Sequence, residues 1–110
     1  MDKKAVKEYL PRAYEAVNKK KKSDIKRGDF SAFGATIIMS GLFPAISAYS
    51  KDEKKHILDI LDEVTGEKLR EKLKGYCKRE NCKGETFDEE ALTEKTVNAI
   101  IAVKLVLDAQ

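Results

Sequence analysis

Apolar residues recur along much of the chain at three- and four-residue steps, which is the spacing of amphipathic α-helices. Near the start, Val6, Ala13 and Val17 follow this spacing and predict a first helix. Pro11 falls within the pattern. Because proline has no amide hydrogen to donate, it either kinks this helix or marks its true first turn. A polar connector is expected to follow at residues 19–29.

Residues 30–50 contain no charged side chain, although 37% of the whole chain is charged. These 21 residues match the thickness of a bilayer, so a membrane span is one interpretation. However, Gly41 suits the left-handed position after a helix, and Pro44 suits the first turn of the next helix. Only 13 of the 21 residues are apolar, so we favour a buried hairpin of two short helices. The helices are expected at about 30–40 and 43–50, with the turn at 41–43.

Three further helices are predicted in the second half of the chain. The first ends at Thr65 and Gly66, and the second covers about 67–76. The third, at 91–109, is apolar on nearly all sides, so it should lie at the centre of a bundle. The residues expected to face the core from the first two helices are Ile57, Leu58, Leu61, Val64, Leu69 and Leu73.

Polar side chains that accept backbone hydrogen bonds predict where several helices begin. Asp29 is a candidate N-cap for the first helix of the hairpin, and Ser50 or Asp52 for the helix that follows the hairpin. Thr86 and Glu89 have the spacing of a capping box, in which each residue satisfies a free amide of the other.

No segment shows the sustained alternation of a β-strand. A chain of 110 residues, 42% of them apolar, is large enough to bury one core but not two. We therefore predict an all-α protein in which residues 1–110 form one compact domain, a bundle of about five to six helices with a buried helical hairpin. The lysine-rich N-terminus does not resemble a secretory signal, so we expect the protein in the cytoplasm.

Two cysteines and one histidine offer little chemistry. Cys77 and Cys82 are too few for a disulfide scaffold and cannot close a tetrahedral zinc site. They form either one local disulfide or two free thiols. His56 is the only histidine, and with Glu53 and Asp59 it would make a poor metal site. We therefore expect no metal and no cofactor.

Three carboxylates, Asp59, Asp62 and Glu63, lie at helical spacing on one side of a predicted helix. They are either a cation site or acid–base pair, or simply a solvated face. We favour the solvated face because no second acidic cluster or phosphate-binding loop accompanies them. The sequence also lacks a G-x-S-x-G motif, and we do not expect an enzyme.

A dense basic run lies between the first helix and the uncharged stretch, with six cations in nine residues. Clustered cations attract phosphates and release counterions, although lysines that contact phosphates do not read bases. The net charge of +3 proves little by itself, and the run is also compatible with a solvated loop. The candidate RNA-binding residues are Lys19, Lys20, Lys21, Lys22, Lys26 and Arg27, extended by Lys51 and Lys104.

Two segments resemble a known family. Residues 37–51 read IIMSGLFPAISAYSK, and residues 93–109 read TEKTVNAIIAVKLVLDA with Lys104 near the end. Together with the N-terminal helix and its basic exit, they resemble the small α-helical subunit of type III-B CRISPR effector (Cmr) complexes. The chain is shorter than typical members between the two segments, and Ala102 stands where an aromatic residue is common. A small subunit of another CRISPR type is therefore an alternative.

The resemblance implies a non-catalytic subunit that stacks along an RNA-guided antiviral complex. Its partners would be other Cmr subunits, neighbouring copies of itself, guide RNA and target RNA, without a membrane. Its basic face would hold the RNA duplex by charge and shape, independently of sequence. The alternatives are a membrane-anchored protein and a stand-alone DNA-binding regulator with a helix-turn-helix at 31–50. The segment PAISAYS lacks the Arg, Asn or Gln that read base edges.

Overall fold

The computed structural model describes residues 3–19, 25–50, 55–78 and 89–109, with the side chains of 76–78 excepted. These residues form six helices, and no strand occurs among them, so the predicted all-α bundle is confirmed. The helices are α1 (Lys3–Asn18), α2 (Arg27–Ser40), α3 (Leu42–Ser50), α4 (Lys55–Thr65), α5 (Leu69–Lys78) and α6 (Glu89–Ala109).

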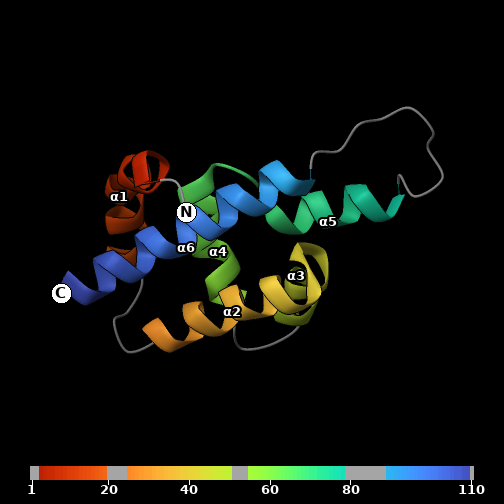
Figure 1. Ribbon diagram of the computed structural model, residues 1–110, viewed down its shortest axis with the longest axis horizontal. Coiled ribbons are helices and arrows are strands. Elements are labelled where there is room, and N and C mark those ends of the chain that lie inside the picture. Colours follow the sequence, from red (N-terminus) through yellow and green to blue (C-terminus); the bar gives the residue numbers. More distant parts are fainter. Residues whose placement is uncertain (1–2, 20–24, 51–54, 79–88, 110) are drawn as a thin grey trace.

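Helix α6 runs through the middle of the molecule, and α1, α2 and α4 all pack against it (Figure 1). The prediction of a central last helix is thereby confirmed. The cause is its composition, since a helix that is apolar on several sides loses most from contact with water and gains most from central burial. Its buried side chains are Leu92, Thr96, Asn98, Ala99, Ile100, Ala102, Val103 and Val106.

The uncharged stretch folds as the predicted helical hairpin of α2 and α3. Gly41 has a positive φ of 93°, and its N–H donates to the carbonyl oxygen of Ile37 at 2.8 Å, which ends α2. Pro44 lies in the first turn of α3, where its missing amide hydrogen is harmless. The rings of Phe33 and Tyr49 pack with centroids 4.8 Å apart and join the two helices. The turn is one residue long, shorter than expected, because α3 starts at Leu42.

Helix α2 begins earlier than predicted, and the assignment of Asp29 as its N-cap is wrong. Its N-cap is Lys26, whose side chain makes no capping hydrogen bond. The Asp29 N–H donates to the Lys26 carbonyl oxygen at 3.1 Å, which closes the first turn before Asp29 is reached. Asp29 therefore lies inside the first turn, where its negative charge still favours the helix N-terminus.

Two other helix boundaries differ from the predictions. Ser50 is the last residue of α3, and its hydroxyl donates to the Ser47 carbonyl oxygen at 3.0 Å, so it does not cap α4. Helix α5 starts at Leu69, two residues later than predicted.

Pro11 lies in the middle of α1, which rules out the interpretation that it marks the first turn of that helix. The predictions that concern Asp52, Thr86, Cys82 and the side chain of Cys77 lie outside the described part of the structure.

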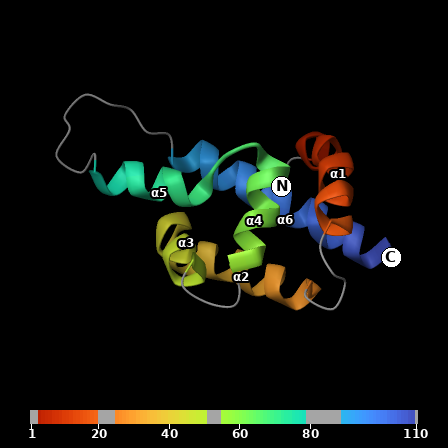
Figure 2. The same cartoon turned by 180° about the vertical axis from the view of Figure 1, so that it is seen from behind.

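All six helices contribute to one hydrophobic core or pack against it. Helix α4 lies between α1 and α5 on one side of α6, as the view from behind shows (Figure 2). The end of α4 at Thr65 and Gly66 is confirmed, because Gly66 has a positive φ of 74° and its N–H donates to the Asp62 carbonyl oxygen at 3.0 Å.

Within the described residues, no helix combines the length and the apolar character that a bilayer crossing requires.

Candidate nucleic-acid interface

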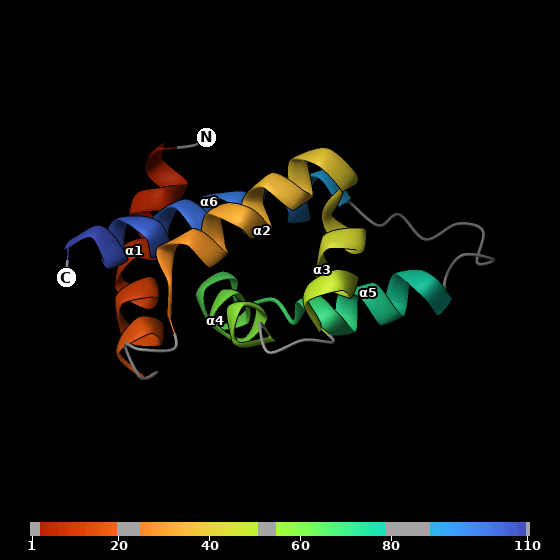
Figure 3. The same ribbon diagram turned by 90° about the horizontal axis from the view of Figure 1, so that it is seen from below.

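Helices α2 and α6 run antiparallel, so the start of α2 lies beside the end of α6 (Figure 3). Arg27, the first residue of α2, places its Nε 2.7 Å from Oδ1 of Asp108 in the last turn of α6. Lys104 precedes Asp108 by four residues, and this spacing puts both on the same side of α6. Lys26 precedes Arg27 directly. We call the surface formed by Lys26, Arg27 and Lys104 the basic end.

The cations of the basic end differ in how they are compensated. The Arg27 side chain is 52% exposed and is paired with Asp108. Lys26 is exposed and Lys104 is half-buried, and neither forms an ion pair with another residue that the structure describes. The basic end therefore offers two uncompensated ammonium groups and one guanidinium that a carboxylate partly neutralises. Phosphate oxygens are suitable ligands for all three groups.

The other candidate RNA-binding residues are not part of this cluster. Lys19, at the end of α1, donates a hydrogen bond from Nζ to Oε1 of Glu63 on α4. This bond raises the pKa of the Lys19 amine, and the carboxylate neutralises the charge locally. Lys20, Lys21, Lys22 and Lys51 lie outside the described residues.

Asp108 is a site residue that sequence reasoning missed. An acidic residue in the last turn of a helix is unfavourable, because the C-terminal end of the helix dipole is negative. Helix α6 carries no basic residue in its last turn to offset Asp108. This local imbalance is a signal in the sequence that a cation from elsewhere lies near Asp108, although the sequence does not say which one.

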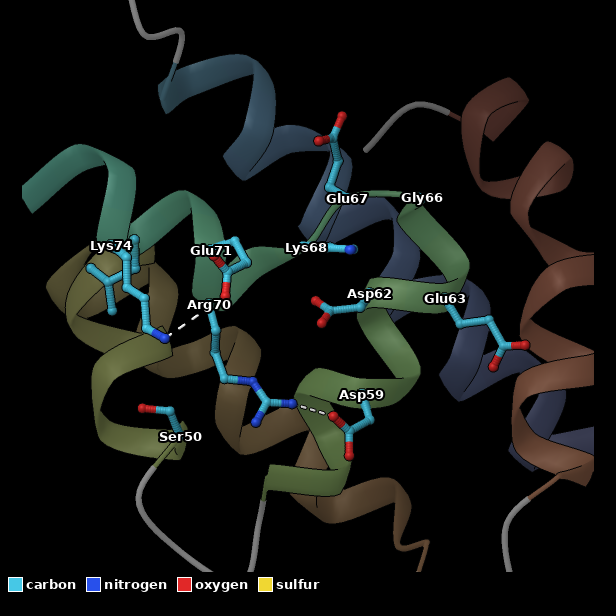
Figure 4. Close-up of a pocket in the computed structure, with 11 residues that line it drawn as sticks. Ser50, Asp59, Asp62, Glu63, Gly66, Glu67, Lys68, Arg70, Glu71 and Lys74 are labelled. Carbon is cyan, nitrogen blue, oxygen red and sulfur yellow. Dashed lines mark hydrogen bonds and ion pairs between the residues drawn. The ribbon is translucent and has the colours of Figure 1, made fainter. Parts of the chain in front are cut away.

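The carboxylates Asp59 and Glu63 of α4 are partly exposed, at 42% and 37%, as the sequence favoured, but each of the three carboxylates has a partner of its own. Asp59 accepts a hydrogen bond from Arg70 of α5, and Glu63 points the other way, toward α1 (Figure 4). Asp62 lies between them and accepts the backbone N–H of Leu69 at 2.9 Å. Each carboxylate thus holds a different part of the chain against α4. Their spacing along the sequence contained no information about these three partners.

Asp62 is the carboxylate of this set that burial affects. Burial raises the pKa of its carboxyl, and the hydrogen bond from Leu69 and the nearby charge of Arg70 oppose that shift only in part. Asp62 lines an open hollow of about 900 Å³ between α4, α5 and the end of α3. The hollow carries both signs of charge, with Lys68, Arg70 and Lys74 beside the acids (Figure 4). Five acids line the hollow against these three cations, and all of the acids except Asp62 form ion pairs with a lysine or arginine, so most of the charge in the hollow is already compensated.

A connector residue, Glu67, ties α5 to the central helix. Its carboxylate accepts a hydrogen bond from Lys95 of α6 at 3.0 Å and lies 3.5 Å from Nζ of Lys72 on α5. The bond from Lys95 is the largest cause of a lowered pKa for the Glu67 carboxyl. Glu67 is therefore held as an anion between two cations.

Neither a metal centre nor a base-reading helix emerges from the described side chains. No group of three or more His, Cys, Asp or Glu residues in the described part of the chain has metal-binding geometry. His56, the second residue of α4, is half-buried. In α3, the fully exposed side chains are Pro44 and Ala48, which have no hydrogen-bonding atoms, and the polar side chains are only the half-buried hydroxyls of Ser47, Tyr49 and Ser50.

No protein-family model matches this chain, and neither a curated protein nor a solved structure shows significant similarity to it. The chain's own residues and the resemblance of its segments 37–51 and 93–109 are therefore what point to a function.

Proposed function

We propose that this protein is a non-catalytic small subunit of a type III-B CRISPR (Cmr) ribonucleoprotein complex, acting in the cytoplasm in antiviral defence. In this role it binds other subunits and neighbouring copies of itself, and it helps to hold guide and target RNA. Its contribution is electrostatic and sequence-independent, while other subunits cut the target.

The resemblance and the fold support this proposal together. The segment 37–51 forms the junction of α2 and α3, and its interior residues Ile37, Leu42 and Ile46 are buried. The segment 93–109 forms most of the central helix α6. The two segments that carry the resemblance are thus the ones around which the bundle is organised.

The observation that carries the RNA-binding role is the basic end. Lys26 and Arg27 are far from Lys104 in the sequence, yet Arg27 pairs with Asp108, which follows Lys104 by one turn of α6. The basic run 19–27 leads directly into it. Clustered lysines without an aromatic side chain in the run favour phosphate contacts over base stacking.

Binding to RNA duplexes tests the proposal. We expect weak binding to a guide–target duplex, equal binding to a duplex of unrelated sequence, and an affinity that falls steeply with salt. Charge reversal of Lys20, Lys22 and Arg27 to Glu should weaken binding about tenfold or more at low salt, because phosphate contacts are lost. The slope of log K against log[salt] should also become shallower by about 0.9 for each lost contact. Fluorescence anisotropy measures both quantities.

The matched control reverses three exposed lysines elsewhere, Lys3, Lys7 and Lys68, and changes the net charge equally. If both triple variants lose affinity to the same extent, the basic run 19–27 has no special role in RNA binding. Purification from the native host provides a second test, in which guide RNA and a set of larger subunits should accompany the protein. Recovery of the protein alone and free of nucleic acid would contradict the proposal.

The alternative of a stand-alone DNA-binding regulator has less support. A recognition helix must present polar side chains to the major groove. Helix α3 instead buries Leu42, Phe43, Ala45 and Ile46 and packs against α2, α4 and α5. Sequence-specific binding of duplex DNA by the purified protein would nevertheless favour this alternative.

A further inference from the structure

The end of α2 exposes two adjacent large apolar side chains. Ile38 is 81% exposed and Met39 is 85% exposed, the highest values for large hydrophobic side chains in the described part of the chain. The next most exposed are Tyr14 at 57% and Leu105 at 48%. Ile37, directly before this pair, is buried in the core, so the apolar pair is additional to the side chains that fold the protein.

An open hollow lies beside this end of α2. It has a volume of about 390 Å³ and lies between the α2–α3 turn and the first turns of α6. Leu42 and Val97 give it apolar walls, and the buried Asn98 adds an amide. The α2–α3 turn and the start of α6, which border the hollow, lie at the opposite end of the antiparallel pair from the start of α2 (Figures 1 and 3). The 14 residues of α2 separate the two ends by about 20 Å.

Three glutamates of α6, Glu89, Glu90 and Glu94, line the same hollow. None of them forms an ion pair with a residue that the structure describes. Several carboxylates elsewhere are compensated, among them Glu63 by Lys19 and Asp108 by Arg27. Uncompensated negative charge therefore lines the hollow that begins at Gly41, two residues after the exposed Met39, in a chain whose net charge is +3.

We propose that this surface docks a basic amphipathic helix of another protein. We call it the acidic end and define it by Ile38, Met39, Glu89, Glu90 and Glu94. The apolar stripe of the partner helix covers Ile38 and Met39, and lysine or arginine side chains beside that stripe donate charge-assisted hydrogen bonds to the glutamates. The inference goes beyond the proposed function, because it concerns a different surface and does not require RNA.

The chemistry of the surface selects this partner over other classes. Nucleic acid is repelled, because its phosphates carry the same sign of charge as the three glutamates. A partner that adds a strand needs a free sheet edge, and the described residues contain no strand. Apolar side chains beside carboxylates fit a helix in which apolar residues at three- and four-residue spacing are flanked by cations.

A defined peptide tests the proposal. The probe is a synthetic helix of about 18 residues, five turns long, with leucine at helical spacing and lysine at the flanking positions. The matched probe has glutamate at every lysine position. We expect the purified protein to bind the lysine peptide at least about tenfold more tightly than the glutamate peptide, by isothermal titration calorimetry at low salt.

Variants locate the binding site. Ile38→Ser with Met39→Ser should weaken binding of the lysine peptide about tenfold or more, the scale expected for buried apolar side chains. Glu90→Lys with Glu94→Lys should weaken it similarly. The controls are Leu105→Ser and Glu8→Lys, an exposed apolar residue and an exposed acid elsewhere, which should leave binding unchanged. RNA affinity of the Ile38→Ser and Met39→Ser variant should also stay unchanged, whether or not the proposed function holds.

Several outcomes would overturn the docking proposal. Equal binding of both peptides, or an equal loss in the control variants, would mean that the acidic end does not select a basic helix. Concentration-dependent self-association that the Ile38→Ser and Met39→Ser variant abolishes would make a second copy the occupant. Protection of Met39 from oxidation in the isolated monomer would mean that the chain itself covers the surface. Circular dichroism verifies that each variant keeps its helical content.

Discussion

The guanidinium of Arg27 lies against the carboxylate of Asp108, with Nε and Oδ1 2.7 Å apart, and so joins the start of α2 to the end of α6. Each side chain is about half exposed, at 52% and 50%, so the pair adds at most about 1 kcal/mol to stability. Its larger consequence is electrostatic. Asp108 competes with phosphate for Arg27, and it also places a negative charge on the surface proposed to bind RNA.

Substitution of Asp108 should therefore strengthen RNA binding. Asp108→Asn frees Arg27 and removes the negative charge, and we expect the affinity at low salt to rise about two- to fivefold, the scale of one exposed charge interaction. The free energy of unfolding, measured by thermal denaturation, should change by less than about 1 kcal/mol. Glu90→Gln is the matched control, because it changes the net charge equally at the opposite end of α6. An equal gain in both variants would show an effect of net charge alone.

A side chain at Gly41 should destabilise the hairpin. Gly41 has φ of 93°, a conformation that a β-branched residue adopts poorly, so Gly41→Val should lower the free energy of unfolding by about 1–2 kcal/mol or more. Urea unfolding followed by circular dichroism measures the change. A change near zero would mean that the backbone at this position relaxes without cost.

Gly34, inside α2, offers the opposite case. A Cβ at Gly34 would lie 3.9 Å from Cγ2 of Ile100 on α6, an ordinary van der Waals contact. Gly34→Ala should therefore raise the free energy of unfolding by about 0.5–1 kcal/mol, because alanine loses less backbone entropy on folding. The same urea experiment measures it. A loss of stability would show that α2 and α6 pack too closely for a methyl group.

Removal of the Asp62 carboxylate should release the start of α5. Asp62→Ala leaves the Leu69 N–H without its acceptor and should cost about 0.5–2 kcal/mol, as for other helix caps. Asp62→Asn keeps an acceptor oxygen and should cost less. Because burial raises the pKa of Asp62, its protonation stabilises the fold at low pH. That contribution is lost as the pH rises from about 3.9 through the raised pKa.

The Asn variant should therefore gain stability relative to the wild type as the pH rises from about 4 to 7, since it lacks this titration. Unfolding in urea at a series of pH values gives the comparison. A difference that does not depend on pH would show that Asp62 has the same pKa in the folded and unfolded chains.

Glu67 should show the opposite pH dependence. Its pKa is lowered, mainly by the hydrogen bond from Lys95, so its stabilising contribution is present above about pH 4.3 and is lost as the pH falls through the lowered pKa. Glu67→Gln should lower stability at pH 7 by up to about 1 kcal/mol and should match the wild type near pH 2. Glu71→Gln, which removes only an exposed pair with Lys74, is the control. Equal effects of both substitutions would contradict a special role for Glu67.

The hairpin is an element that the local sequence pattern predicts correctly. Gly41 and Pro44 specify a turn through backbone chemistry alone, since a positive φ and a missing amide are properties of single residues. Asp29 shows where local pattern fails. An aspartate is favourable both at the N-cap and inside the first turn, so the identity of Asp29 alone did not locate the start of α2. The hydrogen bond from the Asp29 N–H to the Lys26 carbonyl oxygen shows that the helix begins earlier.

The sequence by itself determined that the protein is helical, that residues 30–50 form an interior hairpin and that α6 lies at the centre, because helical periodicity and burial follow from the order of apolar residues. Only the tertiary structure decided which charges meet. Asp59, Asp62 and Glu63 look alike in sequence, yet they bind Arg70, the Leu69 amide and Lys19. The antiparallel packing of α2 on α6 likewise separates a basic from an acidic end. Ion pairs form between residues that folding brings close, and no local rule encodes that distance.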